Sequence, residues 1–164
     1  MGDGYYDQIA SGYDELHGEE QLRKAKLVLE SLEVSPSDSL LDVGCGTAHY
    51  LSIFPCKKQG IDPSAELLKK ASIPVVQGVA ESLPFADSYF DIVLSLTAIH
   101  HCSDVKKAVS EMLRVSRRDT VISVLRKSQK FKEVEQVLSA LRPHKRVDEL
   151  HDVIFFIRKT LNKQ

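Results

Sequence analysis

Two short strand-like segments, the first of them apolar, constrain the fold more than any other part of the chain. The first, residues 39–43, reads Ser-Leu-Leu-Asp-Val and leads into the glycine-rich turn 44–48. The second, residues 57–62, ends in a carboxylate twenty residues after Asp42. Glycine allows backbone conformations and close approaches that side chains forbid. Because neighbouring parallel strands end at the same edge of a sheet, we expect Asp62 to lie beside the glycine turn.

The spacing of the glycines indicates which ligand this turn suits. A dinucleotide-binding fingerprint has a glycine three residues after Gly46, whereas this chain has His49 there. The turn reads Asp-x-Gly-x-Gly-x-Ala, with Ala48 in the third position, and lacks the lysine of a phosphate-binding P-loop. In a βαβ arrangement Asp62 is placed to accept hydrogen bonds from both ribose hydroxyls. We therefore expect an adenosine-containing ligand without a diphosphate.

Composition is that of an ordinary globular protein. The 164 residues are 43% hydrophobic and 27% charged, which suits a single domain over residues 1–164. No segment approaches the roughly 20 apolar residues that span a bilayer, and we expect no secretory leader at the N-terminus. The three cysteines are an odd number at unrelated spacings, which favours a reducing compartment. These features predict a cytoplasmic protein without a membrane span.

Charge is unevenly distributed, although the net charge is −1. Residues 1–20 contain six acidic side chains and no Lys or Arg. Residues 111–164 contain thirteen Lys and Arg against seven Asp and Glu. Such an excess can form a face for an anionic partner, and its alternative is a solvated surface on the last helices. An RNA or protein that binds through the basic region 114–146 therefore stays open as a partner.

Hydrophobic periodicity predicts alternating strands and helices. Apolar residues at three- and four-residue steps predict an amphipathic helix over residues 19–33. The further predicted helices are 64–71, 104–115 and 131–141, and the predicted strands are 39–43, 57–62, 74–77, 90–96 and 120–125. Residues 146–150 and 152–160 read as a hairpin that turns near His151. Alternation of this kind implies an α/β fold with a parallel sheet, to which the hairpin adds one antiparallel strand.

The ordered motifs resemble those of the class I S-adenosylmethionine-dependent methyltransferases, type 11 branch, which includes ubiquinone- and menaquinone-biosynthesis enzymes. The resemblance extends from about residue 5 to residue 159. It implies a Rossmann-like three-layer sandwich around a seven-stranded, mostly parallel sheet with one antiparallel strand. It also implies S-adenosylmethionine as the cofactor. The expected cofactor contacts are Tyr13, Asp42, Gly44, Cys45, Gly46, Asp62, Pro63, Ala80, Glu81 and Ser95.

The N-terminal residues and the glycine turn take their expected roles from this resemblance. Residues 5–14 are similar to a family signature that folds over the cofactor, so residues 1–18 are expected to form a lid. Tyr13 would then contact the methionine part, and the alternative is an unstructured acidic segment. Asp42 and the glycine backbone would face the same part of the cofactor. Cys45 would contribute its backbone rather than a catalytic thiol, because no base is evident beside it.

Two segments depart from the family pattern. Where the family usually has an acidic residue that binds the adenine amino group, this chain has Val79. Ala80 can still offer its backbone N–H to the ring, and Glu81 is a substitute acceptor whose alternative is exposure to solvent. The family usually has Pro-Gly-Gly before the fifth strand, whereas residues 116–119 are Ser-Arg-Arg-Asp here. That substitution predicts a locally altered loop.

The residues that follow the fourth strand are candidates for catalysis. Ser95 and the loop after it would lie at the carboxyl ends of the strands, beside the ligand crevice. A neutral imidazole at His100 or His101 can remove a proton from the acceptor as the methyl group moves. In the alternative, one histidine packs under the loop and the other faces water. No metal site is expected from these residues, because adjacent side chains diverge.

The sequence therefore predicts an S-adenosylmethionine-dependent methyltransferase whose acceptor it does not identify. With little length left for an acceptor domain, a small molecule under the lid is expected first, and a macromolecule on the open rim is the other option. An aminopropyltransferase is disfavoured, because His100 and His101 stand where an acidic polyamine pocket would be needed. A non-catalytic cofactor-binding or partner subunit is the second alternative, and Val79 together with the missing Pro-Gly-Gly favours it.

Overall fold

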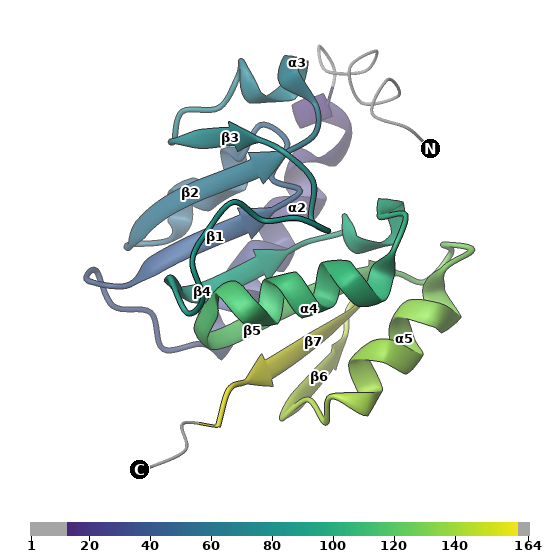
Figure 1. Cartoon of the computed structure of the whole chain (residues 1–164). Coiled ribbons are helices and arrows are strands. Elements are labelled where there is room, and N and C mark those ends of the chain that lie inside the picture. Colours follow the sequence, from purple (N-terminus) through teal and green to yellow (C-terminus); the bar gives the residue numbers. More distant parts are fainter. Residues whose placement is uncertain (1–12, 161–164) are drawn as a thin grey trace.

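A seven-stranded sheet forms the centre of the computed structural model, which describes the backbone of residues 13–160 and the side chains of residues 17–160 (Figure 1). The strands are β1 (Ser39–Val43), β2 (Lys57–Asp62), β3 (Val75–Gln77), β4 (Phe90–Ser95), β5 (Ser116–Leu125), β6 (Lys145–Asp148) and β7 (Asp152–Arg158). Their order is β3-β2-β1-β4-β5-β7-β6. β7 is antiparallel to both of its neighbours, and the other pairs are parallel. The expected mostly parallel sheet with one reversed strand is confirmed.

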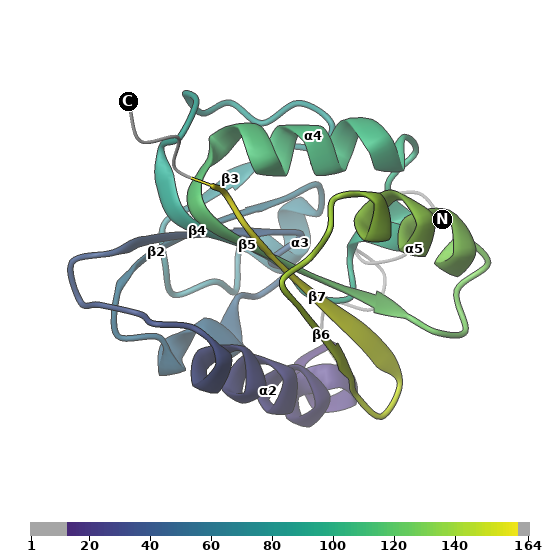
Figure 2. The ribbon, with the colours of Figure 1, turned by 90° about the horizontal axis from the view of Figure 1, so that it is seen from below.

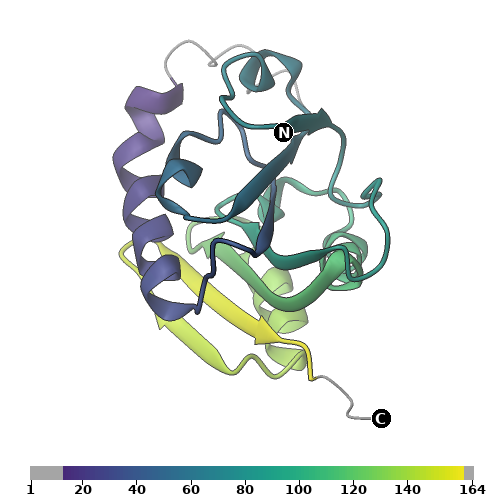
Figure 3. The ribbon, with the colours of Figure 1, turned by 90° about the vertical axis from the view of Figure 1, so that its left-hand side faces the viewer.

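Helices cover both faces of the sheet (Figure 2). The described helices are α2 (Tyr13–Ser31), α3 (Ala65–Leu68), α4 (Val105–Val115) and α5 (Phe131–Ala140), with the 3₁₀ turns η1 (His49–Ile53) and η2 (Ile99–His101). α4 and α5 pack on one face, while α2 runs along the other beside the C-terminal hairpin (Figures 2 and 3). The arrangement is the three-layer sandwich that the family resemblance implies.

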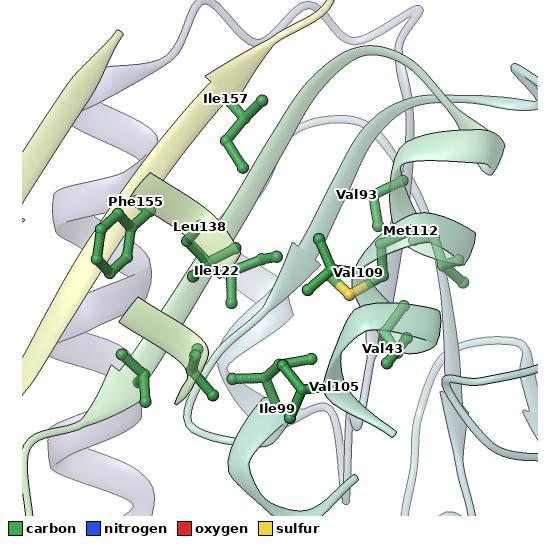
Figure 4. Packing of buried hydrophobic residues seen from close by; sticks show 14 of the residues in the cluster. Val43, Val93, Ile99, Val105, Val109, Met112, Ile122, Leu138, Phe155 and Ile157 are labelled. Atoms are coloured by element: carbon green, nitrogen blue, oxygen red, sulfur yellow. The ribbon is translucent and has the colours of Figure 1, made fainter. Parts of the chain in front are cut away.

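Alternation along β7 shows how the sequence builds two cores from one sheet. Successive strand side chains point to opposite faces. Val153, Phe155 and Ile157 join the core under α4 and α5, while Ile154 and Phe156 join the core under α2. In Figure 4, Phe155 and Ile157 lie with side chains from α4 and α5 in the first of these cores. Burial on both faces explains why the strand is apolar almost throughout.

The prediction of an altered loop at residues 116–119 is wrong. α4 ends at Val115, and β5 begins at the next residue, so that residues 116–119 are the first part of a ten-residue strand. Neither proline nor glycine interrupts the extended backbone there. Arg117 pairs with Asp91, and Arg118 pairs with Asp38 at 3.1 Å. The two arginines hold the start of the strand against neighbouring segments.

Other differences concern the ends of elements. α2 begins at Tyr13 and ends at Ser31, so residues 13–18 of the expected lid are helical, and residues 1–12 lie outside the described part of the chain. The helix expected over residues 64–71 is only four residues long. Its N-cap is Ser64, whose hydroxyl accepts a hydrogen bond from the N–H of Leu67. Within residues 13–160, no helix is long and apolar enough to cross a membrane.

Candidate functional site

A pocket opens where the order of the strands reverses. β1 lies between β2 and β4, so the chain leaves β1 toward one edge of the sheet and later returns to its other side. Open α/β sheets bind ligands outside the carboxyl ends of the strands at such a switch point. The pocket there has a volume of about 280 Å³. It is lined by Val43, Gly44, Ile61, Asp62, Pro63, Leu67, Gly78, Val79, Ala80, Glu81, Ser95, Thr97, Ala98, His101, Cys102 and Ser103.

The turn after β1 has the backbone geometry for which glycine is suited. Gly44 and Gly46 have φ angles of 77° and 55°, in the left-handed region. The N–H groups of Gly44 and Cys45 both donate to the carbonyl of Ile61, at 2.8 and 3.1 Å. A Cβ atom on Gly44 would lie 2.4 Å from the Cβ of Ala98. Both the φ angle and this contact therefore exclude a side chain at residue 44.

Asp62 ends β2 and connects it to the glycine turn. One carboxylate oxygen accepts a hydrogen bond from the N–H of Gly46 at 2.8 Å, and the other accepts from the N–H of Ser64 at 2.8 Å. The side chain lines the pocket although Asp62 is only 7% exposed. These two backbone donors help to fix the direction of the carboxylate at the pocket.

Asp42 lies behind the pocket wall and is not among the residues that line the pocket. One of its oxygens accepts the hydroxyl of Tyr50, and Oδ1 is buried without a hydrogen-bond partner among the described residues. Burial raises the pKa of Asp42 to about 8; Tyr50 opposes this shift and the charge of Asp62 adds to it. The Asp42 carboxyl is therefore largely protonated near pH 7.

Cys45 places its side chain away from the pocket. Its Sγ atom lies against the backbone of β2, so close to Gly60 that a Cβ there would meet the sulfur at 2.5 Å. Burial, reinforced by Asp42 and Asp62, raises the pKa of the thiol. A neutral buried thiol is a packing group rather than a nucleophile.

The loop after β3 forms the outer wall of the pocket. Val79 is 45% exposed at the pocket, in the position where the family pattern has an acid. Glu81 also lines the pocket, and its Oε1 accepts from the N–H and the hydroxyl of Ser103 at 2.8 and 3.0 Å. Burial opposes ionisation of Glu81, but hydrogen bonds to the carboxylate prevail and lower its pKa. Glu81 is thus charged and connects this loop to the segment before α4.

The two histidines after β4 differ in position. His101 lines the pocket and His100 does not, although their ring centroids are 4.1 Å apart. Burial, followed by the neighbouring His101, lowers the pKa of His100 to about 4, and burial also lowers the pKa of His101. Both imidazoles are therefore neutral near pH 7. Burial raises the pKa of the adjacent Cys102 thiol to about 12.

The pocket brings together most of the residues that the sequence singles out. Those that line it are Gly44, Asp62, Pro63, Ala80, Glu81, Ser95 and His101. Asp42, Cys45, Gly46 and His100 are not among the lining residues, and the side chain of Tyr13 lies outside the described residues. Sequence reasoning missed Thr97, Ala98, Cys102 and Ser103. Their position directly after the strand that ends at Ser95 is the signal that could have identified them.

Comparisons with known proteins agree with this geometry. The chain matches the methyltransferase domain family over residues 41–124, about half of its length. The uncharacterised methyltransferase YcgJ of Bacillus subtilis is 37% identical over 106 residues, which cover 57% of this chain and 42% of the relative. A demethylmenaquinone methyltransferase of Renibacterium salmoninarum is 32% identical over 126 residues, which cover 68% of this chain and 52% of the relative.

The solved structures include a similar fold. An S-adenosylmethionine-dependent methyltransferase from Aquifex aeolicus matches with a TM-score of 0.69 and 19% identity, over 82% of this chain and 88% of that one. At this level of identity the likeness shows the fold alone. The chain spans about half the length of the curated relatives it matches. The family match and the ordered motifs together show that this chain belongs to the methyltransferase domain family, as the resemblance predicted.

Proposed function

We propose that the protein is an S-adenosylmethionine-dependent methyltransferase that acts on a small-molecule acceptor. The observation that carries this proposal is the pocket at the switch point, where the Asp62 carboxylate lies beside the glycine turn. An acid held in this direction suits the two hydroxyls of a ribose, because a charged acceptor strengthens each hydrogen bond. The glycine turn supports the same ligand, since it lets the cofactor approach the backbone closely.

The charges around the pocket suit a cationic cofactor. S-adenosylmethionine supplies a methyl group bound to a positively charged sulfur. Asp62 and Glu81 contribute carboxylates to the lining, and no Lys or Arg is among the described lining residues. The donor and acceptor set of the pocket therefore fits the cofactor that the family uses.

Apolar side chains suit the adenine end of the same ligand. Ile61, Leu67 and Val79 line the pocket next to Asp62, so that an adenine attached to the ribose would lie among them. With Val79 in place of an acid, we assign hydrogen bonding of the adenine to the backbone N–H of Ala80. Adenine recognition would then depend on apolar contact and the backbone, since Oε1 of Glu81 already accepts hydrogen bonds from Ser103.

His101 is the candidate base for the acceptor, and His100 is its neighbour outside the pocket. A neutral imidazole can take a proton from a hydroxyl or an ammonium group. Alignment of the acceptor with the methyl group can supply much of the rate enhancement, so a strong base is unnecessary. The lowered pKa of His101 suits an acceptor whose proton becomes acidic as the new bond forms.

Ion pairs within the molecule favour a small-molecule acceptor over RNA. Much of the positive charge of the basic region 114–146 is already neutralised. Arg114 pairs with Glu111 and Asp87, Arg118 with Asp38, Arg126 with Asp148, and Arg146 with Glu135. Paired arginines attract phosphates less strongly than unpaired ones.

The reducing compartment that the cysteines indicate would be the cytoplasm.

Calorimetric titration with S-adenosylmethionine and S-adenosylhomocysteine tests the cofactor. We expect micromolar binding by the wild type and a loss of at least tenfold in Asp62→Asn. Asp38→Asn is the matched control, because Asp38 is equally buried (7% exposed) and accepts the N–H of Ser35 away from the pocket. Equal binding by Asp62→Asn and the control, or no binding by the wild type, would contradict the proposal.

A screen of acceptors then separates the enzyme from its alternative. Transfer of labelled methyl groups to small phenols, quinols, amines or carboxylates supports the proposed function. Transfer only to RNA or protein would overturn the small-molecule part of it. Micromolar cofactor binding without turnover on any class would indicate a non-catalytic subunit, the alternative that Val79 favours.

A further inference from the structure

A lysine without any solvent exposure lies beneath the loop that follows β4. Lys24 of α2 donates from Nζ to Glu20 at 3.1 Å, to Asp152 at 3.2 Å and to the hydroxyl of Thr97. These three bonds use all three N–H groups of the ammonium. Asp152, the first residue of β7, is also fully buried. Neither Lys24 nor Asp152 lines the pocket.

Asp152 gathers donors from three different elements. Its Oδ2 accepts from Lys24 on α2, from the hydroxyl of Thr97 at 2.8 Å and from the hydroxyl of Ser123 on β5 at 2.9 Å. The Ser123 hydroxyl in turn accepts the backbone N–H of Thr97 at 2.7 Å. The backbone N–H and the hydroxyl of Thr97 are therefore both held by one network.

Thr97 needs such support because of its backbone conformation. Its φ angle is 55°, in the left-handed region that a β-branched residue strongly disfavours. Conformations of this kind persist only where the surroundings determine them, and they cluster at ligand sites. A buried ion pair adds little net stability compared with apolar packing. The Lys24–Asp152 pair is therefore better explained by the conformation that it imposes on Thr97 than by a contribution to folding stability.

The conformation of Thr97 determines where the pocket wall lies. Ala98 follows it directly and is packed against Gly44 of the glycine turn. The carbonyl of Ala98 accepts the N–H of His101 at 3.0 Å, and this bond closes the 3₁₀ turn that carries the histidines. Thr97, Ala98 and His101 all line the pocket. A shift at Thr97 would consequently move both the wall over the glycine turn and the candidate base.

We infer that Lys24, Asp152 and Ser123 are positioning residues, which hold Thr97 in its left-handed conformation and thereby set the wall of the cofactor pocket. The inference rests on the proposed function for its binding readout. It connects α2 and the C-terminal hairpin to the pocket without direct contact between these residues and the ligand.

Ser123→Ala is the sharpest test, because it removes one hydroxyl and leaves the charges in place. Ser116→Ala is its matched control: Ser116 is equally buried on the same strand, and its hydroxyl donates to the carbonyl of Asp119 at the other end. We expect similar losses of thermal stability in the two variants. We expect S-adenosylhomocysteine to bind about tenfold more weakly to Ser123→Ala and within twofold of wild type to Ser116→Ala. Asp152→Asn should weaken binding at least as much as Ser123→Ala.

Amide hydrogen exchange without ligand separates this inference from the proposed function. The N–H groups of His101 and Cys102 are bonded within the turn, to Ala98 and Ile99, and neither contacts Ser123 directly. We expect their exchange to accelerate at least tenfold in Ser123→Ala and to stay unchanged in Ser116→Ala. Unchanged exchange, or accelerated exchange with full-strength binding, would overturn the inference. Failure of the wild type to bind would instead overturn the proposed function, and exchange alone would then decide the positioning role.

Discussion

The carboxylate of Asp62 accepts the backbone N–H of Gly46 at 2.8 Å, which joins the end of β2 to the turn after β1. The two residues are sixteen positions apart in the sequence, and the parallel pairing of β1 with β2 brings them together. This bond orients the acid before any ligand arrives. Preorganisation of this kind reduces the cost of ordering the site on binding.

Replacement of Gly44 by alanine should destroy the site. The left-handed backbone and the 2.4 Å approach to Ala98 predict a loss of about 2–4 kcal/mol in the free energy of unfolding, together with loss of cofactor binding. Gly18→Ala is the control, since a Cβ at Gly18 in α2 meets nothing within 4 Å. That substitution should stabilise the protein by roughly 0.5–1 kcal/mol. Urea denaturation and calorimetry measure both effects, and a tolerated Gly44→Ala would contradict the account of the turn.

Asp42 should make the protein less stable as pH rises. Its pKa is raised from 3.8 to about 8 in the folded state, so between these values the folded protein holds a proton that the unfolded chain releases. The free energy of unfolding then falls through this window by roughly 1.4 kcal/mol per pH unit from this group. Asp42→Asn removes that contribution. Urea denaturation at pH 5 and pH 7.5 measures the free energy of unfolding of both proteins. The stability of Asp42→Asn relative to the wild type should therefore be higher at pH 7.5 than at pH 5. A pH-independent difference would disprove the buried protonated state.

His100 should have the opposite effect at acidic pH. Its pKa is lowered from 6.5 to about 4, so the unfolded chain takes up a proton in this window that the folded protein does not. Stability contributed by the neutral ring is present above pH 6.5 and is lost as pH falls toward 4, by up to roughly 3 kcal/mol. In urea denaturation from pH 7 to pH 4.5, the free energy of unfolding should fall less for His100→Gln than for the wild type. His144→Gln, at an exposed position, is the control. An equal fall in His100→Gln and the wild type would mean that His100 is protonated in the folded state.

Arg118 should matter for folding rather than for binding an anionic partner. Its guanidinium bonds Asp38 at 3.1 Å and the buried Asp119 at 2.8 Å. Arg118→Met removes one partner of each carboxylate, while Arg158 still pairs with Asp119, and should cost about 2 kcal/mol. Arg117→Met removes a more exposed pair with Asp91 and should cost less than about 1 kcal/mol. Equal losses in thermal denaturation, or reduced RNA binding by Arg118→Met alone, would contradict this assignment.

The central strands β1 and β4 could be predicted because they are largely apolar and buried. β1 and β2 have the predicted bounds: β1 ends where an apolar run meets Gly44, and the more polar β2 ends at Asp62, directly before Pro63. The prediction for residues 116–119 was wrong because two adjacent arginines are, in the local sequence, typical of a surface loop. Only the three-dimensional structure reveals that Arg118 finds Asp38, eighty residues away.

Residues of the candidate site that belong to a local sequence motif could be predicted. Residues whose conformation depends on contacts between distant segments could not. Asp62 and Gly44 follow from spacing and the strand-to-turn pattern. The position of Thr97 after β4 indicates the pocket, but the contacts that hold its backbone could not be predicted, because they involve Lys24 and Asp152, which lie 73 and 55 residues away in the sequence. A lysine in an amphipathic helix reads as a solvated residue until its partners are known.

A crystal structure with S-adenosylhomocysteine tests the central claim most directly. The account predicts the ribose hydroxyls within hydrogen-bond distance of Asp62, the adenine beside Val79 with its ring at the N–H of Ala80, and the sulfur facing the His101 side of the pocket. Ligand bound elsewhere, or a ribose that does not contact Asp62, would contradict it.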